Sequence, residues 1–380
     1  MSQEEIGADI ERYFAELTDP RADNKRHLLL DMIIVAICGA ICGAEGWEDV
    51  ALFGRSKQAW FKRFLPLPHG IPSDDTFRRV FAVLDAQQFQ DCFIDWVQAI
   101  TQVIEGQIIP IDGKQLRRSH DNSLGKKAIH MVSAWAAENR VVLGQRKVDE
   151  KSNEISAIPE LLDVLAVNGC IVTIDAMGCQ TDIAAKIVEQ QADYVLALKE
   201  NQKNLYEAVL GLFAHPEEMA WVDIDYHKTV DKGHGRLEIR ECWSTSDADY
   251  LHYIGTLSDW PGLKSLAMVR AERRIGHNNS IKYRLFISSL PSDAQRILHA
   301  VRTHWDIENK VHWVLDVVFR EDDCRIRKGN GPQNFAVLRH IALNLLRQET
   351  SANLSVRAKR LRAGWDHDYL LDILAPSQMR

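Results

Sequence analysis

The sequence predicts an α/β fold in which an all-helical N-terminal domain precedes a mixed sheet that carries a strand-rich insertion. Three observations favour this fold class. Apolar side chains recur at helical spacing through residues 1–100, short apolar strands alternate with helices from about residue 105, and four strands follow one another from about 218 to 290. Strands that alternate with helices are typical of parallel pairing, and a run of strands is typical of an antiparallel insertion.

The bulk composition indicates a folded chain of two or three domains. The chain has 380 residues, of which 46% are hydrophobic and 26% are charged, and this length is sufficient for a large core. The longest apolar run, Leu28 to Gly43, is interrupted by Asp31 and is shorter than the roughly 20 residues that a membrane span needs. We therefore expect a cytoplasmic protein with no membrane partner. The seven cysteines form no CxxC pair, so neither a zinc site nor a disulfide framework is indicated.

The net charge limits what kind of nucleic-acid partner the chain can have. The formal charge is −7 at pH 7, which argues against a protein that simply coats DNA. It leaves room for local basic surfaces, because phosphate contacts need only a patch. Two basic stretches stand out, Lys114 to Arg118 and Arg357 to Arg362. Each is either a DNA-binding patch or an ordinary solvated face.

Residues 1–100 are predicted to form a helical N-terminal domain that binds DNA. Apolar spacing indicates a helix from His27 to Ala44. A proline cluster follows, and Ser73 then has the sequence pattern of a helix N-cap. On the next helix Arg78 and Arg79 are predicted to point away from the apolar face. A short helix, a turn and a capped helix with outward arginines suit a DNA reader, and they suit an ordinary helical bundle equally well.

The segment from 105 to 349 is predicted to be one α/β domain. Its first part contains five apolar runs with strand character and helices at about 155–166 and 182–191. The predicted strands are Ile108 to Ile111, Ala128 to Ala136, Val141 to Val148, Ile171 to Ile174 and Tyr194 to Leu198. A three-strand meander followed by two strand–helix repeats is the strand order of a ribonuclease H-like fold.

The remainder of this domain is predicted to be a β insertion followed by helices. The insertion spans about 218–290, with glycines and the Asn278–Asn279 pair supplying turns. Helix then persists to about residue 349, with a break near Gly329 to Pro332. The last segment, 350–380, is predicted to be a basic C-terminal tail.

Two aspartates follow apolar strands of the predicted sheet. Asp112 follows the first strand and precedes Gly113, and Asp175 follows Ile171 to Ile174 and precedes small residues. Acids at the carboxyl ends of neighbouring parallel strands meet at one edge of a sheet, where ligands bind in α/β folds. Two close carboxylates repel each other unless a cation neutralises them, and hard oxygen ligands favour Mg²⁺ or Mn²⁺. For either aspartate alone, the alternative is a turn residue or helix cap.

Helical phase selects a third acid among several candidates near residue 310. With 3.6 residues per turn, Glu308 falls in the middle of an apolar stripe that includes Val301, Trp305 and Val311, whereas Asp306 falls on the solvent side. A glutamate in a core-facing stripe is costly unless a cation or partner compensates its charge. Glu308 is therefore the best third ligand, and the alternative is a buried Glu paired with a structural Arg or Lys.

Three carboxylates arranged in this way are typical of two-metal phosphoryl chemistry. In such sites one divalent ion lowers the pKa of a water or of a 3′-hydroxyl, and the other stabilises the leaving oxygen. We therefore predict that Asp112, Asp175 and Glu308 are both the catalytic and the metal-ligating residues, and that two Mg²⁺ or Mn²⁺ ions are the cofactors.

Basic side chains near these acids are weaker candidates for contact with DNA. Lys114 is placed to contact a phosphate. The two histidines near Glu308 can contact DNA or water, and they suit the role of satisfied core histidines equally well. The full set of candidate DNA-binding residues is Lys114, Arg117, Arg118, His234, Arg236, His304 and His312.

Several of these stretches resemble bacterial insertion-sequence transposases of the DDE superfamily, in particular the group that includes the H-repeat-associated proteins of Rhs elements. The resemblance covers almost the whole chain, and the stretch around the third acid is its most specific part. The matching stretches are Ile111 to Lys114, Thr173 to Gln180, Leu198 to Gln202, Gly233 to Arg236, His304 to Lys310, His312 to Val317 and, near the N-terminus, Gly70 to Phe77.

The resemblance implies a ribonuclease H-like catalytic domain with a β insertion before the glutamate. It also implies two divalent ions, with Asp112, Asp175 and Glu308 as the triad, and recognition of double-stranded DNA at element ends by a homodimer or higher oligomer. Relatives with a β insertion carry a Tyr and an Arg upstream of the glutamate and a Lys downstream. Here Val301, His304 and Leu315 occupy those positions, with His304 in the place of the Arg, so the resemblance leaves both a hairpin route and another strand-processing route open.

The predicted function is therefore a DNA transposase that cleaves element ends and transfers them into target DNA. One alternative is a catalytically inactive or domesticated relic that still binds DNA. Another is a plain ribonuclease H-like nuclease or resolvase, against which the long β insertion and the helical N-terminal domain argue.

Overall fold

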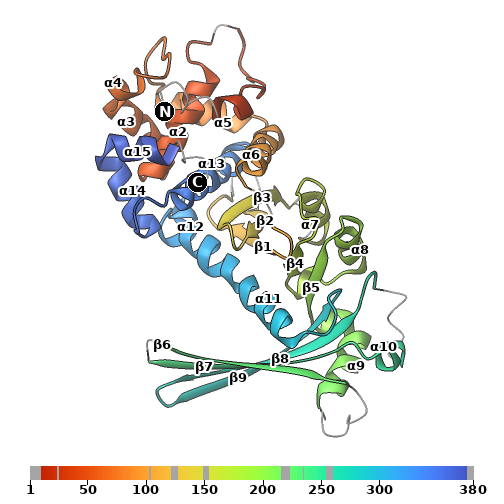
Figure 1. Cartoon of the computed structure of the whole chain (residues 1–380). Helices are drawn as coiled ribbons and strands as arrows, with labels where there is room; N and C mark the ends of the chain where they lie inside the picture. The colour runs from red at the N-terminus through yellow and green to blue at the C-terminus, as the bar shows by residue number, and fades with distance from the viewer. Residues whose placement is uncertain are drawn as a thin grey trace.

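A computed structural model describes residues 10–23, 25–101, 104–120, 127–148, 154–214, 223–233, 235–253 and 260–374. Within these ranges the strands form one mixed sheet of nine, in the order β3-β2-β1-β4-β5-β9-β8-β7-β6 (Figure 1). The strands are β1 (Ile108–Leu116), β2 (Ile129–Ala136), β3 (Val141–Lys147), β4 (Ile171–Ile174), β5 (Asp193–Leu198), β6 (Asp225–Gly233), β7 (Arg236–Thr245), β8 (Ser265–Ile275) and β9 (Asn278–Ser288).

The first five strands have the order that the sequence predicts. β1, β2 and β3 form an antiparallel meander. β4 and β5 then add parallel to β1, with α7 (Glu154–Leu162) and α8 (Thr181–Glu189) in the connections. One prediction is corrected: β1 does not end at Asp112, because residues as far as Leu116 continue to pair with β2. Only the stretch Ile108 to Ile111 pairs with β4, so β1 loses its parallel partner at Asp112.

The predicted β insertion is a continuation of the same sheet. β9 pairs antiparallel with β5, and β8, β7 and β6 follow in antiparallel order. The far ends of these four strands extend away from the body of the molecule as a long arm (Figure 1). Besides α8, the described residues between β4 and β8 form four helices: η2 (Ala176–Gly178), η3 (Glu200–Gln202), α9 (Lys203–Ala214) and α10 (Ala248–Tyr253).

The N-terminal segment is helical, as predicted, and comprises α2 (Leu29–Cys42), α3 (Trp47–Ser56), α4 (Gln58–Phe61), α5 (Asp74–Val83) and α6 (Ala86–Ile100). The predicted cap is confirmed, because Ser73 Oγ accepts a hydrogen bond from the backbone N–H of Thr76 at 3.2 Å. Arg78 does point away from the apolar face of α5, but Glu48, Asp74 and Asp75 neutralise it. No single helix in the described ranges is long and apolar enough to cross a membrane, although the bent pair α2 and α3 meets the length and composition criteria together.

The helices after the insertion connect the two parts of the molecule. They are α11 (Ala294–Asp306), the π-helix η4 (Ile307–His312), α12 (Trp313–Val317), η5 (Glu321–Asp323), α13 (Gly331–Gln348), α14 (Val356–Trp365) and α15 (His367–Leu374). α13 contacts both β3 and the N-terminal helices α2, α5 and α6. The helical part of the molecule therefore contains elements from both ends of the chain (Figure 1).

The expected basic tail is instead, as far as residue 374, a pair of helices that pack on α2 and α13. Lys359 and Arg360 in its basic stretch are buried. Arg360 donates to the carbonyl oxygens of Ala40 and Ile41 at the end of α2. Carbonyls in a last helical turn have no partner within the helix, so these cations satisfy buried backbone groups, a role that spacing along the sequence does not reveal.

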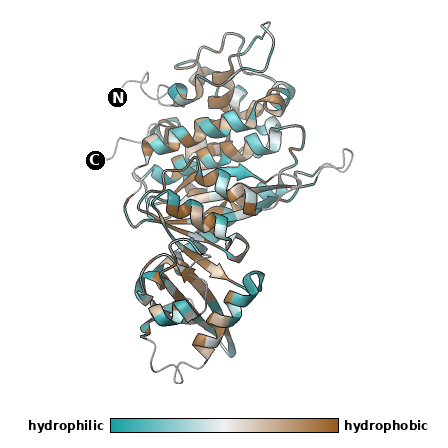
Figure 2. Ribbon diagram, turned by 90° about the vertical axis from the view of Figure 1, so that its right-hand side faces the viewer, coloured by the Kyte–Doolittle hydropathy of each residue, from teal (hydrophilic) through white to brown (hydrophobic). Residues whose placement is uncertain are grey.

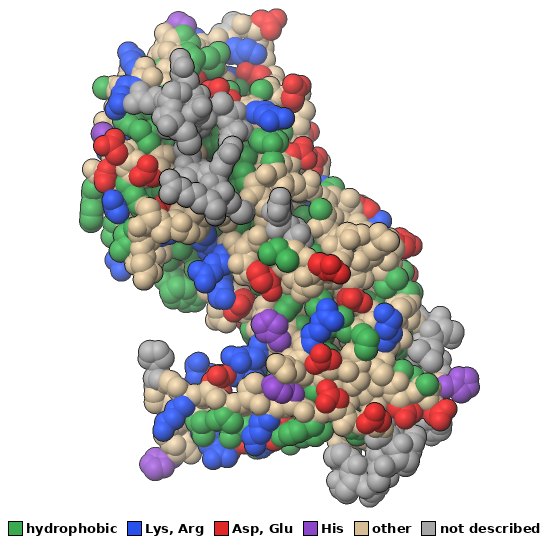
Figure 3. Space-filling model, in the orientation of Figure 1, with side chains coloured by type: hydrophobic (Ala, Val, Ile, Leu, Met, Phe, Trp, Pro, Cys, Tyr) green, Lys and Arg blue, Asp and Glu red, His purple; other side chains and the backbone are tan. Residues whose placement is uncertain are grey.

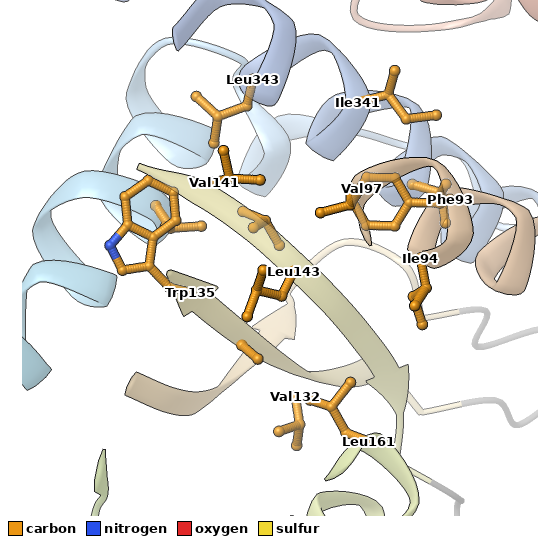
Figure 4. Packing of buried hydrophobic residues seen from close by; sticks show 14 of the residues in the cluster. Phe93, Ile94, Val97, Val132, Trp135, Val141, Leu143, Leu161, Ile341 and Leu343 are labelled. Carbon is orange, nitrogen blue, oxygen red and sulfur yellow. The ribbon is translucent and has the colours of Figure 1, made fainter. Parts of the chain in front are cut away.

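The hydrophobic core runs between the sheet and the helices on its two faces. Figure 4 shows side chains of β2 and β3 packed among residues of α6, α7 and α13. Trp135, Val141 and Phe93 are completely buried in this layer. Hydrophobic residues concentrate along the strands and on the helix faces that cover them (Figure 2).

Candidate active site

Asp112 and Asp175 lie next to each other on neighbouring strands. In the parallel pair β1 and β4, Ile111 is in register with Ile174, so the two aspartates are the next residues along each strand. This confirms the prediction that both acids reach the same edge of the sheet. The parallel pairing ends at this register, which leaves room beyond Ile174 for ligands, as is typical of α/β sheets.

The loop after Asp175 is held by its own side chain and by residues from η3. Asp175 Oδ1 accepts hydrogen bonds from the N–H groups of Met177 at 3.0 Å and Gly178 at 3.4 Å. Asn201 Nδ2 donates to Ala176 O at 2.8 Å, and Gln202 Nε2 donates to Cys179 O at 2.9 Å. Asp175 is therefore a helix cap as well as a candidate ligand, and the Asn201–Gln202 pair holds the loop in place.

Glu308 reaches the same edge, but not for the reason that helical phase predicts. It lies in the π-helix Ile307–His312, where the extra residue per turn shifts the phase. Glu308 is exposed, and Ile307, Val311 and His312 are the buried residues of this turn. Trp305, which was expected in the core stripe, is 40% exposed. The assumption of a uniform period of 3.6 residues was wrong, because in the π-helix the Glu308 side chain lies outside the core and lines a cavity.

The three predicted acids line one cavity of about 210 Å³. Two cationic side chains, Lys199 and Arg284, line it as well. The complete lining is Asp112, Thr173, Ile174, Asp175, Ala176, Val195, Ala197, Lys199, Arg284, Phe286, Val301, His304, Trp305 and Glu308. Three acidic and two basic side chains thus face the same space. Lys199, from the Leu198 to Gln202 stretch, was missed as a site residue because nothing in its spacing distinguishes it from a surface lysine.

The electrostatics of the cavity centre on Asp112. Burial raises the pKa of the Asp112 carboxyl to about 7, and the neighbouring carboxylates Asp175, Glu154 and Glu308 contribute to this increase. The backbone N–H of Gly113 acts in the opposite direction. The negative charge of these four acids is therefore incompletely compensated by the protein, which is the situation that a bound cation relieves.

Glu154 and His130 form an adjoining pair that the sequence did not indicate. Glu154 Oε1 lies 2.7 Å from His130 Nε2, and this hydrogen bond raises the pKa of His130. A Cβ atom on Gly113 would overlap the Glu154 carboxyl group and crowd His130. Glycine after Asp112 is thus explained by the approach of a fourth carboxylate. Glu154 comes from the start of α7, so only the tertiary structure brings it here.

The two predicted histidines have different positions around the acids. His304 lines the cavity and its Nδ1 lies 3.0 Å from Thr173 Oγ1. His312 Nδ1 lies 3.5 Å from Asp112 Oδ2. Burial lowers the pKa of His304 to about 4 and that of His312 to about 3, so both rings are neutral at pH 7. Contact of His304 with DNA stays a prediction, whereas buried His312 is positioned as a neighbour of Asp112.

Lys114 forms buried ion pairs in the structure, and its contact with a phosphate stays a prediction. Its Nζ is enclosed between Asp316 and Glu321, with Glu321 Oε2 at 2.5 Å, and the side chain is only 11% exposed. Alternate residues of a strand share a face, so Lys114 lies on the same side of β1 as Asp112. There it ties β1 to the segment after the π-helix, and two of its three N–H groups donate to carboxylates.

The remaining candidates for DNA contact have mixed outcomes. Arg117 and Arg118 are exposed, but they form ion pairs with Asp322 at 3.3 Å and Asp323 at 3.4 Å, respectively. Arg236 pairs with Glu238 and lines a hollow beneath α11. His234 lies outside the described residues. Contact of Arg117, Arg118 and Arg236 with DNA stays a prediction.

The chemistry of the cavity suits divalent ions, although its side chains are not gathered tightly. Across the described ranges, no group of three or more His, Cys, Asp or Glu side chains is arranged to hold a metal ion. The oxygen donors of Asp112, Asp175 and Glu308 are nevertheless the type that Mg²⁺ and Mn²⁺ prefer. Their shared cavity and the raised pKa of Asp112 fit a cation between them.

Open edges of α/β sheets are where ligands bind, and the family match defines the class of protein to which this carboxylate-lined edge belongs. Residues 97–345 match the family described as Transposase DDE domain, and residues 11–97 match the family described as DDE_Tnp_1-associated. The chain belongs to the DDE transposase family. The boundary at residue 97 falls within the last turn of α6, where the helical segment leads into the sheet.

Two full-length relatives have names that agree with this family. The chain is 41% identical to "H repeat-associated putative transposase YhhI" of Escherichia coli K12, over 92% of this chain and 93% of the relative. It is 39% identical to "Putative transposase YncI" of Escherichia coli O157:H7, over 96% and 93%, respectively. Among solved structures, it is similar to a piggyBac transposase synaptic complex with hairpin DNA, at 14% identity and a TM-score of 0.45, covering 100% of this chain and 81% of that chain.

Proposed function

We propose that this chain is an active DNA transposase in which Asp112, Asp175 and Glu308 form the catalytic triad. The single observation that carries the proposal is that these acids, from β1, β4 and the π-helix, line one cavity together with Lys199 and Arg284. The proposed reaction is hydrolysis of a phosphodiester bond at each element end. The freed 3′-hydroxyl then attacks a phosphodiester of target DNA.

The domain that performs this chemistry is proposed to be ribonuclease H-like, with the β insertion between the second aspartate and the glutamate. Support comes from the order of the first five strands, β3-β2-β1-β4-β5, and from the place of the two aspartates at the end of the β1–β4 pairing. The insertion, β6 to β9, follows Asp175 and precedes Glu308 in the chain. It therefore has the position that the family resemblance implies.

Two Mg²⁺ or Mn²⁺ ions are proposed as cofactors, held by Asp112, Asp175 and Glu308. When bound, they would lower the pKa of the attacking hydroxyl and stabilise the leaving oxygen. The chain's own residues prepare the site. Thr173 orients the His304 ring, the Asn201–Gln202 pair fixes the loop that presents Asp175, and Lys199 supplies a cation for a phosphate in the cavity.

The path of double-stranded DNA to the acids is proposed to follow a basic hollow that adjoins the cavity. This hollow lies between α11 and the strands of the arm, and it shares Arg284, Val301 and Trp305 with the cavity. Arg284 stacks on Trp305, with its guanidinium carbon 4.7 Å from the ring centroid. Arg236 and Arg302 extend the hollow towards the arm. Figure 3 shows the recess between the arm and the body, with Lys and Arg side chains along its border.

Assembly and domain roles follow from the same proposal. The helical segment 1–100 is assigned to DNA binding, and the strand-transfer reaction joins two element ends to one target. A homodimer or higher oligomer on DNA is therefore proposed, because two sites must act on two ends. The location of the protein stays a prediction from its sequence.

The test is strand cleavage by purified protein on a duplex that carries the element's own end, with Mg²⁺ present. We expect wild-type protein to nick the duplex and join it to a target plasmid, and we expect Asp112→Asn and Glu308→Gln to do neither. Glu207→Gln is the control, because Glu207 is 63% exposed and lines neither the cavity nor the adjoining hollow. Equal nicking by the wild-type and triad variants would refute the assignment, and cutting without joining would point to a nuclease.

The alternative function is a DNA-binding relic without catalysis. One observation favours considering it: a 54-residue stretch is 43% identical to "Inactive transposase YbfQ" of Escherichia coli K12, covering 14% of this chain and 64% of that relative. Here all three acids are present and share a cavity, which favours activity. A gel shift with element-end DNA and no cleavage under any divalent ion would support the relic.

A further inference from the structure

A second basic hollow lies in the helical part of the molecule and shares no residue with the cavity of acids. It encloses about 830 Å³. Its walls come from the segment before α2, from α5 and from the loop before α13. The lining residues are Arg21, Lys25, Arg26, His27, Ser73, Thr76, Arg79, Val80, Ala82, Val83 and Lys328. Five of them are permanent cations, and no Asp or Glu is among them.

The charge of this hollow is only partly neutralised. Asp19 pairs with both Arg21 at 2.8 Å and Lys25 at 3.3 Å, and Asp75 pairs with Arg79 at 2.9 Å. Arg26 and Lys328 are exposed, and neither forms an ion pair within the described ranges. Two acids therefore face five cations, which leaves a local charge of about +3 on a protein whose net charge is −7.

The backbone that follows Lys328 is held in place against α5. The next residue, Gly329, has φ +55°, and a Cβ at this position would overlap the carbonyl oxygen of Ala82. Asn330 donates from its backbone N–H to Ala82 O at 2.9 Å and from Nδ2 to Leu84 O at 3.0 Å. Glycine permits this close approach, and the hydrogen bonds fix the loop against the end of α5.

The opposite wall is fixed in a comparable way. His27 Nδ1 lies 3.1 Å from the carbonyl oxygen of Gly70, so the basic segment before α2 is held against the loop that precedes α5. Burial lowers the pKa of His27, which makes this ring a neutral support and not a further charge. The Ser73 and Thr76 hydroxyls also line the hollow; they hydrogen-bond to each other at 3.0 Å, which leaves one hydroxyl proton for donation to an anion.

We propose that this hollow binds the phosphate backbone of double-stranded DNA, with Arg26 and Lys328 as its two principal contacts. The proposal deepens the proposed function and rests on it, because it supplies the DNA-binding surface of the helical part. This surface also differs from the one that the sequence predicts, which is the outward face of α5 with Arg78 and Arg79. Arg78 has three acids within 4 Å and does not line the hollow, whereas Arg79 has one acidic partner and does line it. α5 therefore contributes Arg79 to a concave wall that recognises charge and shape without reading bases.

The test measures the affinity of the full-length protein for a fluorescently labelled, random-sequence duplex by anisotropy, in EDTA, over a series of salt concentrations. EDTA removes catalysis, so the measurement does not depend on the triad. Each phosphate contact contributes about 0.9 to the slope of log affinity against log salt. The Arg26→Ala/Lys328→Ala variant should therefore lose roughly 2 from this slope and bind more weakly.

Two control variants keep the test decisive. Lys203→Ala/Lys264→Ala removes the same charge from exposed positions outside the hollow and should leave the slope within error of wild type. Arg26→Lys/Lys328→Arg keeps the charge and should retain the slope, which separates lost contacts from misfolding. The proposal is overturned if the alanine pair behaves as the Lys203/Lys264 control does. A reduced slope in a protein that never cleaves DNA would uphold this surface and reject only the catalytic assignment.

Discussion

Lys114 Nζ lies 2.5 Å from Glu321 Oε2, and this ion pair connects the strand that carries Asp112 to the segment that follows Glu308. Glu321 also faces Arg339 of α13 at 3.5 Å. All three side chains are almost fully buried. The pair therefore fixes the distance between the two chain segments that supply the first and third acids.

Removal of one partner of this buried pair is expected to destabilise the protein strongly. Glu321→Gln leaves Lys114 and Arg339 without full compensation, so the free energy of unfolding should fall by about 3 kcal/mol. Asp322→Asn is the matched control, because its partner Arg117 is exposed and such pairs contribute less than about 1 kcal/mol. Urea unfolding followed by circular dichroism measures both. Equal losses in the two variants would contradict the role of the buried pair.

Stability is expected to fall at acidic pH through Glu349. Burial alone would raise the pKa of this carboxyl, but hydrogen bonds from Ser351, Tyr369 and Lys359 lower it to about 2. A lowered folded-state pKa stabilises the protein above the unfolded value of about 4.3, and this contribution is lost as the pH falls towards 2.

At pH 7, Glu349→Gln should therefore lower the free energy of unfolding by on the order of 2 kcal/mol and lower the melting temperature with it. Between pH 5 and 2, the melting temperature of this variant should fall less than that of wild type. The measurement is thermal unfolding over this pH range. Glu207→Gln is the control, because Glu207 is 63% exposed and should leave the profile unchanged. An identical pH profile for wild type and Glu349→Gln would exclude this group as a source of the acid sensitivity.

Gly329 and Gly276 allow steric overlap to be separated from backbone strain. Both have positive φ, +55° and +54°, but a Cβ at Gly276 meets open space and one at Gly329 overlaps Ala82 O. Gly276→Ala should cost about 1 kcal/mol from its φ angle, and Gly329→Ala should cost about 2 kcal/mol or more. Chemical denaturation measures the difference. Equal costs would mean that the loop before α13 can move away from α5.

Lys199 is expected to matter for turnover and little for overall DNA affinity. It lines the cavity of the three acids, where a cation can stabilise charge that develops on a phosphate. Lys199→Ala should lower the cleavage rate by roughly 100-fold and should change duplex affinity only slightly. Lys203→Ala, four residues on and 74% exposed, is the control. Loss of affinity without loss of rate would assign Lys199 to binding instead.

The two aspartates and the order of the strands could be predicted because their determinants are local. A run of apolar residues before Asp112 and another before Asp175 define strands, and alternation with helices defines parallel pairing. Together these facts bring the acids to one edge without any knowledge of distant contacts. The Ser73 cap was predictable for the same reason, since its hydrogen bond spans three residues.

Glu308 shows where local periodicity fails. Its selection relied on a uniform helix, and the π-helix from Ile307 to His312 changes which side chains face the core. The wider turn of the π-helix is not visible in apolar spacing, because its buried Ile307 and Val311 are four residues apart, as on one face of an ordinary α-helix. The predicted residue still reaches the cavity, although it does so from an exposed face.

The roles of the charged residues likewise depend partly on local sequence and partly on tertiary contacts. The sequence by itself determined the alternation of strands and helices, the place of both aspartates and the family of the chain, because each depends on neighbours a few residues apart. Only the tertiary structure decided that Lys114 and Arg360 serve the interior, that Glu154 and Lys199 join the acids, and that Arg26 and Lys328 share a hollow. The fate of a charge depends on the partners that folding brings to it, and those partners lie tens to hundreds of residues away in this chain.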